Sequence, residues 1–316
     1  MITKQYFFNK KRLLPVDKFI GNILFDKRNG YYSSKFPFGY KGDFITAPGM
    51  SNLFSEIIAV WLISTWNEMG KPKTFNIVEL GPGDGSLTKV IISTLKKFPE
   101  LNKAIKIYLY EKSVFLKKLQ KQNIDNKRIK WIKNFSSIKK GPVIFFGNEF
   151  FDAIPIKQFS NINNELFEKY YSVKNKINII EKFIKSDEKD MTQIKKFETL
   201  KKLKFIEFPK KGFLELNPII KKINKLSGGI LLIDYGYLNE NNSNTIQAVM
   251  DNKKISTETM LKNLGKADIT SLVNFNLLKE YFLKNKLKVK KIVTQRFFLE
   301  RMGIIERARI LEKKKN

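Results

Sequence analysis

Three closely spaced glycines, with an acid before them and another among them, could hold a small ligand. The segment 76–89 reads Asn-Ile-Val-Glu-Leu-Gly-Pro-Gly-Asp-Gly-Ser-Leu-Thr-Lys, so an apolar run precedes Gly81, Gly83 and Gly85. Glycine permits positive φ and lets the backbone approach a ligand closely. We therefore predict a buried strand that turns into a helix around a cofactor, and we call residues 81–85 the glycine loop.

The spacing within the glycine loop separates two classes of ligand. A dinucleotide site is typically G-x-G-x-x-G, with the pyrophosphate at the helix N-terminus. Here the pattern is E-x-G-x-G-x-G, and Asp84 places a negative charge where a phosphate would be repelled. The ammonium and sulfonium of S-adenosylmethionine (SAM) would instead face Glu79 and Asp84. The pattern favours SAM, with an ordinary strand-to-helix turn as the alternative.

Further cofactor-binding candidates follow the next two predicted strands. Glu111 stands 30 residues beyond Gly81, at the end of the second strand, where a carboxylate accepts hydrogen bonds from both ribose hydroxyls. Asn134 and Phe135 follow the third strand and would contact the edge and the face of the adenine. For Glu111 the alternative is a solvated acid at the end of a strand.

Two carboxylates lie between aromatic residues after the fourth predicted strand. The segment 148–155, which we call the acidic segment, reads Asn-Glu-Phe-Phe-Asp-Ala-Ile-Pro and contains Asn148, Glu149 and Asp152. Ligands in open α/β sheets bind beyond the carboxyl ends of the strands, so this segment is expected near the acceptor of a transferred group. A carboxylate pair suits a cationic acceptor such as a guanidinium. The alternative is a helix start whose acids complement the helix dipole.

A segment rich in glycine, proline and aromatic residues, near 30–48, precedes the glycine loop. It is too irregular for a helix or strand, and long ordered loops in compact domains often act as lids. The candidate lid or substrate residues are Tyr31, Tyr32, Asp43 and Thr46. Core packing is the alternative for the two tyrosines.

Strands alternate with helices along most of the chain, which predicts an α/β fold. We expect a doubly wound, Rossmann-like sheet with an N-terminal helical and lid segment and an inserted β-ribbon plus helix. The expected boundaries are 1–70, 71–156, 157–216 and 217–316. Towards the C-terminus we expect a helix starting at Asn217-Pro218, a strand over 288–294 and a last helix over 297–312.

Composition excludes several classes of chemistry. The chain has 316 residues, of which 42% are hydrophobic, and this suits one large domain or two small ones. It has no cysteine and no histidine, so we expect no metal site, and proton transfer falls to carboxylates, tyrosine or lysine. No apolar run approaches the roughly 20 residues of a membrane span, so the bacterial cytoplasm is the expected compartment.

The net charge of +30 invites a comparison with nucleic-acid-binding proteins. Most of the basic residues are lysines scattered from end to end, whereas base and phosphate recognition favours the planar fork of arginine. We therefore do not expect a nucleic acid partner. An RNA methyltransferase stays open as an alternative if the lysines form one basic face.

Several motifs in chain order together resemble the MidA-like family. They are Gly30-Tyr-Tyr, Phe38-Gly-Tyr-Lys-Gly-Asp-Phe-Ile-Thr46, Glu79-Leu-Gly-Pro-Gly-Asp-Gly85, Asn148-Glu-Phe-Phe-Asp-Ala-Ile-Pro155, Leu232-Ile-Asp-Tyr-Gly236 and Thr245-Ile-Gln-Ala248. Mitochondrial members of that family are SAM-dependent protein arginine methyltransferases needed for the assembly of respiratory complex I. The resemblance implies a class I methyltransferase fold, SAM at the glycine loop, Glu149 and Asp152 beside the acceptor, and a protein substrate, with a complex I subunit as the candidate.

The chain departs from the family's pattern at two places. Ala47-Pro48-Gly49-Met50-Ser51 stands where the family usually has Ser-Pro-Glu-Ile-Ser, and Thr270-Ser-Leu-Val-Asn-Phe275 stands where it has Thr-Ala-His-Val-Asp-Phe. An acid, a histidine and an aspartate of the pattern are therefore missing. A SAM-binding assembly chaperone without catalysis is a further alternative, and the oligomeric state is left open by the sequence.

Overall fold

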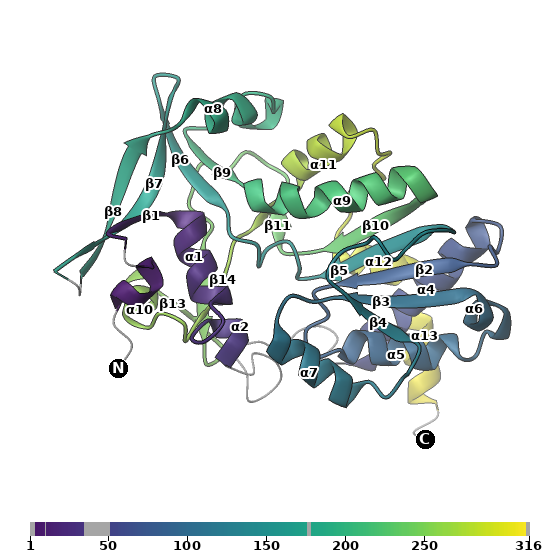
Figure 1. The fold of residues 1–316 in the computed structure, drawn as a ribbon. Coiled ribbons are helices and arrows are strands. Elements are labelled where there is room, and N and C mark those ends of the chain that lie inside the picture. The colour runs from purple at the N-terminus through teal and green to yellow at the C-terminus, as the bar shows by residue number, and fades with distance from the viewer. Residues whose placement is uncertain (1–3, 10, 35–50, 176–177, 314–316) are drawn as a thin grey trace. The chain divides into compact units, whose positions relative to one another are not determined.

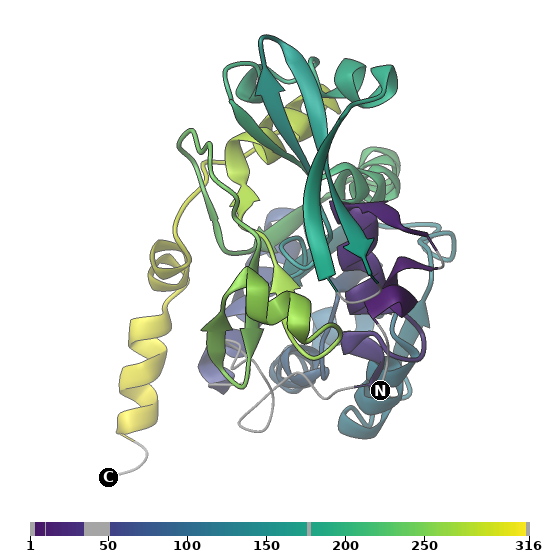
Figure 2. The same cartoon turned by 90° about the vertical axis from the view of Figure 1, so that its left-hand side faces the viewer.

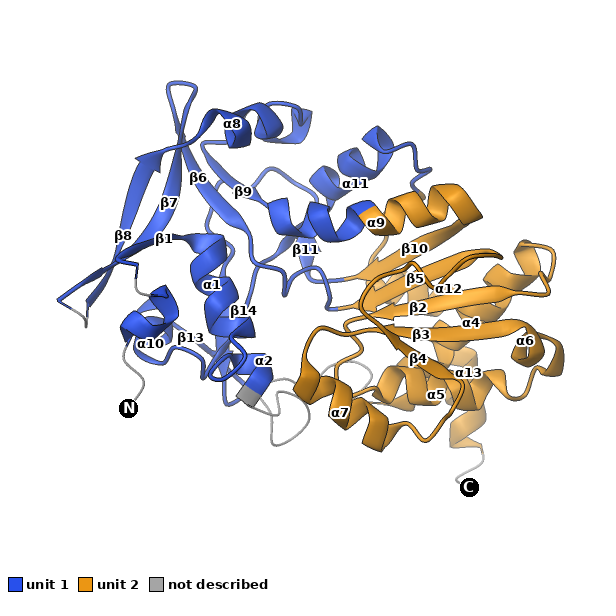
Figure 3. Ribbon diagram, in the orientation of Figure 1, with its two compact units in different colours: residues 1–37, 149–217, 234–289 blue, residues 38–148, 218–233, 290–316 orange. Residues whose placement is uncertain are grey.

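The computed structural model describes residues 4–9, 11–34, 51–175 and 178–313. The chain divides into two compact units (Figure 3). Unit 1 comprises residues 1–37, 149–217 and 234–289, and unit 2 comprises residues 38–148, 218–233 and 290–316. The helix of the expected N-terminal segment that follows Ser51 thus groups with unit 2, and residues 234–289 of the expected C-terminal segment group with unit 1.

Unit 2 is built on a five-stranded parallel sheet with the strand order β10-β5-β2-β3-β4. The strands are β2 (Phe75–Leu80), β3 (Ile105–Tyr110), β4 (Ile129–Ile132), β5 (Val143–Asn148) and β10 (Gly228–Ile233). The first strand of the sheet in chain order, β2, is central, and later strands add on both sides of it. This is the predicted doubly wound arrangement, with a topological switch between β2 and β5.

Helices cover this sheet because its central strand is apolar on both faces. Every residue of β2 is buried, as expected for a parallel strand between two layers. The helices of unit 2 are α4 (Asn52–Glu68), α5 (Ser86–Leu95), α6 (Pro99–Ala104), α7 (Val114–Asn123), α12 (Gln295–Arg301) and α13 (Ile304–Glu312). Figure 1 shows α4, α5, α12 and α13 on one side of the sheet, where their apolar residues share one core with it. Ser51 caps α4, because its hydroxyl accepts from the amide of Leu53 at 3.1 Å.

Unit 1 contains an antiparallel sheet with the order β1-β7-β6-β9, and β8 also pairs with β7. The strands are β1 (Leu13–Pro15), β6 (Lys157–Ile162), β7 (Glu165–Lys174), β8 (Asn178–Lys185) and β9 (Phe205–Phe208). The long teal ribbon of Figure 2 is formed by β6, β7 and β8. Together with α8 (Glu188–Ile194) and the short helix η2 (Glu198–Leu200), it corresponds to the expected ribbon plus helix.

The N-terminal residues supply the core of unit 1. The ring of Phe19 contacts those of Phe8 and Tyr171, with centroids 4.9 and 4.7 Å apart, and all three residues are buried. The remaining elements of this unit are η1 (Lys4–Phe8), α1 (Val16–Phe25), α2 (Tyr31–Ser34), β11 (Gly236–Tyr237), β12 (Gln247–Met250), β13 (Lys253–Ile255), α10 (Thr257–Lys262), β14 (Asp268–Thr270), β15 (Val273–Asn274) and α11 (Phe275–Lys284).

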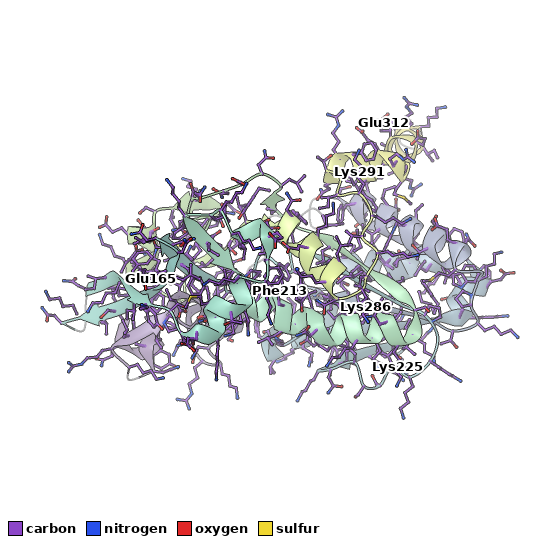
Figure 4. The ribbon with its side chains drawn as sticks, turned by 90° about the horizontal axis from the view of Figure 1, so that it is seen from above. Glu165, Phe213, Lys225, Lys286, Lys291 and Glu312 are labelled. Carbon is purple, nitrogen blue, oxygen red and sulfur yellow. The ribbon has the colours of Figure 1, made fainter. Side chains whose placement is uncertain are left out.

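The helix expected to start at Asn217-Pro218 starts earlier, so this prediction was wrong. α9 spans Lys210–Leu226 with Pro218 inside it. The ring of Phe213 stacks on that of Tyr281 with 3.8 Å between centroids, where α9 passes α11 (Figure 4). The Tyr281 hydroxyl donates to Asn217 Oδ1 at 2.6 Å, so this side chain bonds to α11 and not to the start of a helix. Tertiary packing therefore extends the helix on the N-terminal side of its proline.

Two C-terminal expectations were also wrong. Residues 288–294, expected as a strand, form none, because alternating apolar residues make a strand only where a neighbouring strand pairs with them. The expected single last helix is two helices, α12 and α13, which are separated at Gly303 with a φ of 90°. That left-handed conformation ends α12 and begins α13.

Candidate functional site

The glycine loop of unit 2 has the backbone conformation that its sequence predicts. Gly81, Gly83 and Gly85 have φ values of 61°, 56° and 86°, a region that side chains with a Cβ rarely adopt. A Cβ on Gly85 would lie 2.6 Å from Cδ1 of Ile124. Gly85 is also the residue before α5, so the loop presents its backbone at the start of that helix. The backbone of the loop thus favours glycine at all three positions, and packing against Ile124 excludes a Cβ at Gly85.

The loop is held by α7 through side-chain amides. Gln120 Nε2 donates to the carbonyl of Gly83 at 2.8 Å, and Asn123 Nδ2 donates to that of Asp84 at 3.0 Å. Trp131 Nε1 in turn donates to Gln120 Oε1 at 3.0 Å. Gln120 is fully buried, and sequence reasoning missed it. The available signal was a glutamine among the helical positions that face the sheet.

The acids expected at the cofactor lie at or near this loop. Glu79 is buried at the end of β2 and accepts a hydrogen bond from the Thr88 hydroxyl. Burial raises the pKa of Glu79 to about 8, although the Thr88 bond opposes the rise. Asp84 Oδ1 accepts from the amide of Ser86 at 2.9 Å, so this carboxylate pairs with the first amide of α5.

Glu111 follows β3 and is tied to the same loop. Gly81 donates its amide to the carbonyl of Tyr110 at 3.1 Å, which brings the end of β3 beside the glycines. Glu111 Oε1 accepts from the amide of Ser113 at 2.7 Å, and Oε2 accepts from Gln120 at 3.2 Å. Burial raises the pKa of Glu111. The contact of Glu111 with the ribose of SAM stays a prediction.

The two adenine candidates differ in their surroundings. Asn134 is exposed, and its Oδ1 accepts from the amide and the hydroxyl of Ser136 at 3.0 and 2.6 Å. Phe135 is buried, with its ring 5.1 Å from those of Tyr110 and Phe145. The ring packs against the sheet, and its contact with an adenine stays a prediction.

The two carboxylates expected at the acceptor, Glu149 and Asp152, belong to unit 1 and lie in a cluster of acids. Glu149 has a φ of 52°, which is strained for a residue other than glycine. Asp152 is 5% exposed, and burial and then the nearby charge of Asp234 raise its pKa well above the usual range, with Glu149 and Asp268 adding to the effect. Burial raises the pKa of Asp234 to about 7. We call Glu149, Asp152, Asp234 and Asp268 the carboxylate cluster.

Of the remaining expected site residues, Tyr32 contacts a member of the carboxylate cluster. Asn148 ends β5 in unit 2, paired in register with Ile233 of β10. Tyr31 is fully buried in the core of unit 1, as in the packing alternative, whereas the Tyr32 hydroxyl contacts both carboxylate oxygens of Asp268 at 2.9 Å. Asp43 and Thr46 lie outside the described residues, so the lid stays a prediction.

Sequence reasoning did not assign Asp234 or Asp268 to the site. Asp234 carried a signal, because it ends an apolar strand, but Asp268 carried none, since it lies in a polar stretch with no motif of its own. Within the described ranges no group of three or more acids is arranged to hold a metal ion. No helix in the described part of the chain is long and apolar enough to cross a membrane.

Comparison with known proteins places these features in a family. The profile of a family described as "Putative S-adenosyl-L-methionine-dependent methyltransferase" matches residues 57–293. A Xenopus laevis protein named protein arginine methyltransferase NDUFAF7, mitochondrial, is 26% identical over 96% of this chain and 74% of its own length. A Caenorhabditis elegans homologue of the same name is 30% identical over 87% of this chain and 68% of its own length.

A solved structure shares the fold. A Burkholderia thailandensis protein crystallised with S-adenosyl-homocysteine superposes with a TM-score of 0.79 over 96% of this chain and 80% of its own, at 18% identity. The family profile thus matches most of a chain that has a doubly wound sheet and a glycine loop after its central strand. The chain belongs to this family of S-adenosyl-L-methionine-dependent methyltransferases.

Proposed function

We propose that this methyltransferase transfers the methyl group of SAM to an arginine side chain of a protein, with Glu149 and Asp152 binding the guanidinium. The relatives named as protein arginine methyltransferases support this choice of acceptor. Their names also favour a protein over an RNA substrate. The proposal divides the work: unit 2 binds SAM and unit 1 carries the acceptor carboxylates.

The carboxylate cluster is the observation that carries the proposal. Asp152 is buried, and the charges that act on its pKa, those of Asp234, Glu149 and Asp268, are all negative. Burial and the like charges around it favour the protonated form of Asp152. A protonated guanidinium would neutralise the cluster and offer paired N–H donors to its oxygens.

The chemistry needs both charge and orientation. SAM supplies a methyl group on a sulfonium; the methyl–sulfur bond breaks as the nitrogen–methyl bond forms, and the electron pair stays on sulfur. Glu149 and Asp152 localise the positive charge of the guanidinium on one side, which leaves lone-pair density on the nitrogen that reacts. The proton of that nitrogen passes to a carboxylate of the cluster, which suits carboxylates with raised pKa values.

Glu149→Gln tests this role. The variant keeps the size of the side chain and loses its charge, so we expect turnover to fall by about two orders of magnitude or more while the affinity for SAM stays within about twofold. Glu258→Gln is the matched control, because Glu258 is an exposed acid of the same unit paired with Lys262. Methyl transfer from labelled SAM to a purified acceptor measures the first quantity, and calorimetry measures the second. Unchanged turnover in the Glu149 variant would rule out the role.

The finer identity of the acceptor rests on the family resemblance. We propose a subunit of respiratory complex I as the substrate and the bacterial cytoplasm as the compartment; the named relatives are mitochondrial. Incubating the protein with labelled SAM and a lysate of a strain that lacks it, followed by mass spectrometry of the labelled band, identifies the acceptor. Labelled RNA in place of a labelled protein would overturn this choice.

A further inference from the structure

Asp234 uses one carboxylate oxygen to hold the turn that carries the acceptor residues. Its Oδ1 accepts from the amide of Phe151 at 3.0 Å and from that of Asp152 at 3.2 Å. These amides follow Glu149 and its left-handed backbone. A strained residue keeps its conformation only where its surroundings hold it, and a carboxylate accepting two consecutive amides does so strongly.

The second oxygen of Asp234 has a different environment. Oδ2 is buried and has no hydrogen-bond partner among the described residues, and the same is true of Oδ1 of Asp152. Asp152 is buried, with only 5% of its surface exposed. The amide of Asp152 donates to Asp234 Oδ1, so the two residues are in contact. Each of them therefore also carries one buried oxygen that has no donor within the described ranges. Leaving such buried acceptor atoms unpaired is unfavourable, and a ligand that donates hydrogen bonds to them would remove that cost.

We propose that Asp234 is a third acceptor-site carboxylate with two separate tasks. Its Oδ1 holds the turn from Glu149 to Asp152, and its Oδ2, together with Oδ1 of Asp152, accepts hydrogen bonds from a guanidinium. Two acceptor oxygens from two side chains suit a planar cation with several N–H groups better than a compact ammonium. The choice of arginine as the acceptor rests on the proposed function, whereas the holding of the turn does not.

Two substitutions separate the two tasks. Asp234→Asn keeps a carbonyl oxygen for the amides of Phe151 and Asp152 and replaces the second oxygen by an NH₂ donor, which repels a cation's N–H groups. Asp234→Ala removes both oxygens. Glu280→Gln is the matched control, because Glu280 also accepts two consecutive amides in unit 1, those of Glu198 and Thr199 at 2.8 and 3.0 Å.

Two measurements follow each variant. Hydrogen exchange reports the protection of the Phe151 and Asp152 amides, and titration with N-acetyl-arginine amide, compared with N-acetyl-lysine amide, reports the cation site. We expect the Asn variant to keep the protection within about twofold and to bind the arginine amide about tenfold or more weakly. We expect the Ala variant to lose both, with exchange about tenfold or more faster, and the control to lose neither.

Each outcome decides one task. Full protection in the Ala variant would overturn the holding role, and unchanged binding of the arginine amide in the Asn variant would overturn the cation role. A wild-type protein that binds the arginine amide no better than the lysine amide would also overturn the cation role. If both expectations hold but no arginine of any protein becomes methylated, the proposed function fails while the roles of Asp234 stand.

Discussion

Gln120 donates a hydrogen bond from Nε2 to the carbonyl oxygen of Gly83, 2.8 Å away, and so fixes the middle of the glycine loop to α7. The same amide lies 3.2 Å from Glu111 Oε2, so one buried side chain connects the loop with the proposed ribose-binding acid. Gln120 and Gly83 are 37 positions apart, so no local sequence pattern indicates the bond between them.

Gln120→Leu should weaken SAM binding while leaving the fold intact. Leucine has a similar volume but leaves the Gly83 carbonyl without this donor and the Trp131 indole without its acceptor, at a cost of about 1–3 kcal/mol. We expect about a tenfold or larger rise in Kd for SAM, measured by calorimetry. Lys118→Leu, a change on the same helix with no such contact to the loop, should leave Kd unchanged. Equal affinity in the Gln120 variant would mean that the loop does not depend on α7.

Gly85→Ala should destabilise unit 2 more than Gly70→Ala. Both glycines have left-handed backbones, with φ values of 86° and 75°, so each variant pays about 1–2 kcal/mol for an L-residue there. Only at Gly85 does the new Cβ meet a neighbour, Ile124, since the Cβ at Gly70 meets nothing within 4 Å. We expect Gly85→Ala to lower the free energy of unfolding by about 1–3 kcal/mol more than Gly70→Ala does, and we expect weaker SAM binding in the Gly85 variant alone.

Urea unfolding followed by tryptophan fluorescence measures these two variants, because Trp61, Trp66 and Trp131 all belong to unit 2. Equal losses of stability in the two variants would show that Ile124 moves away at little cost.

Glu79 should make unit 2 less stable as the pH rises. Its pKa is about 8 in the folded protein against an ordinary value of 4.5, so between these values the folded state keeps a proton that the unfolded state releases. The stabilisation is complete below pH 4.5 and is lost as the pH rises through about 8, with a slope of about 1.4 kcal/mol per pH unit from this group. Glu79→Gln should remove that slope.

Unfolding curves collected between pH 5 and pH 8 test the prediction. Glu100→Gln is the control, because Glu100 is an exposed acid of the same unit with a side chain 75% accessible. An identical pH dependence in the wild type and the Glu79 variant would show that Glu79 is ionised in the folded protein at neutral pH.

Tyr32→Phe should change the acceptor site. The variant removes a hydroxyl that lies 2.9 Å from both oxygens of Asp268, so this buried carboxylate loses a hydrogen-bond donor that orients it in the carboxylate cluster. We expect KM for the acceptor to rise several-fold with little change in the affinity for SAM.

Tyr6→Phe is the matched control, because the Tyr6 hydroxyl donates to Asp26 at 2.9 Å in the same unit, outside the carboxylate cluster. Both variants should lose a similar amount of stability, about 1–2 kcal/mol. If KM rises in both variants, or in neither, the Tyr32 hydroxyl has no specific role in acceptor binding.

The central sheet and the glycine loop were predictable because their signals are local. An apolar strand, three glycines and a following amphipathic helix occupy consecutive positions, and sterics alone limit what such a run adopts. The positive φ values of Gly81, Gly83 and Gly85 and the parallel order around β2 confirm those expectations. The predicted helix start at Asn217-Pro218 and the predicted strand over 288–294 were wrong, because packing and strand pairing with distant residues outweighed the local pattern.

The sequence by itself determined that this protein has a SAM-type glycine loop and two acids between aromatic residues, since both depend on neighbours in the chain. Only the tertiary structure decided which other groups join them. Asp234 reaches the amide of Phe151 across 83 residues, and Tyr32 reaches Asp268 across 236. Such bonds form because burial leaves polar atoms no water to bind, so they take whichever partners the fold brings within reach, and no pattern along the chain records that choice.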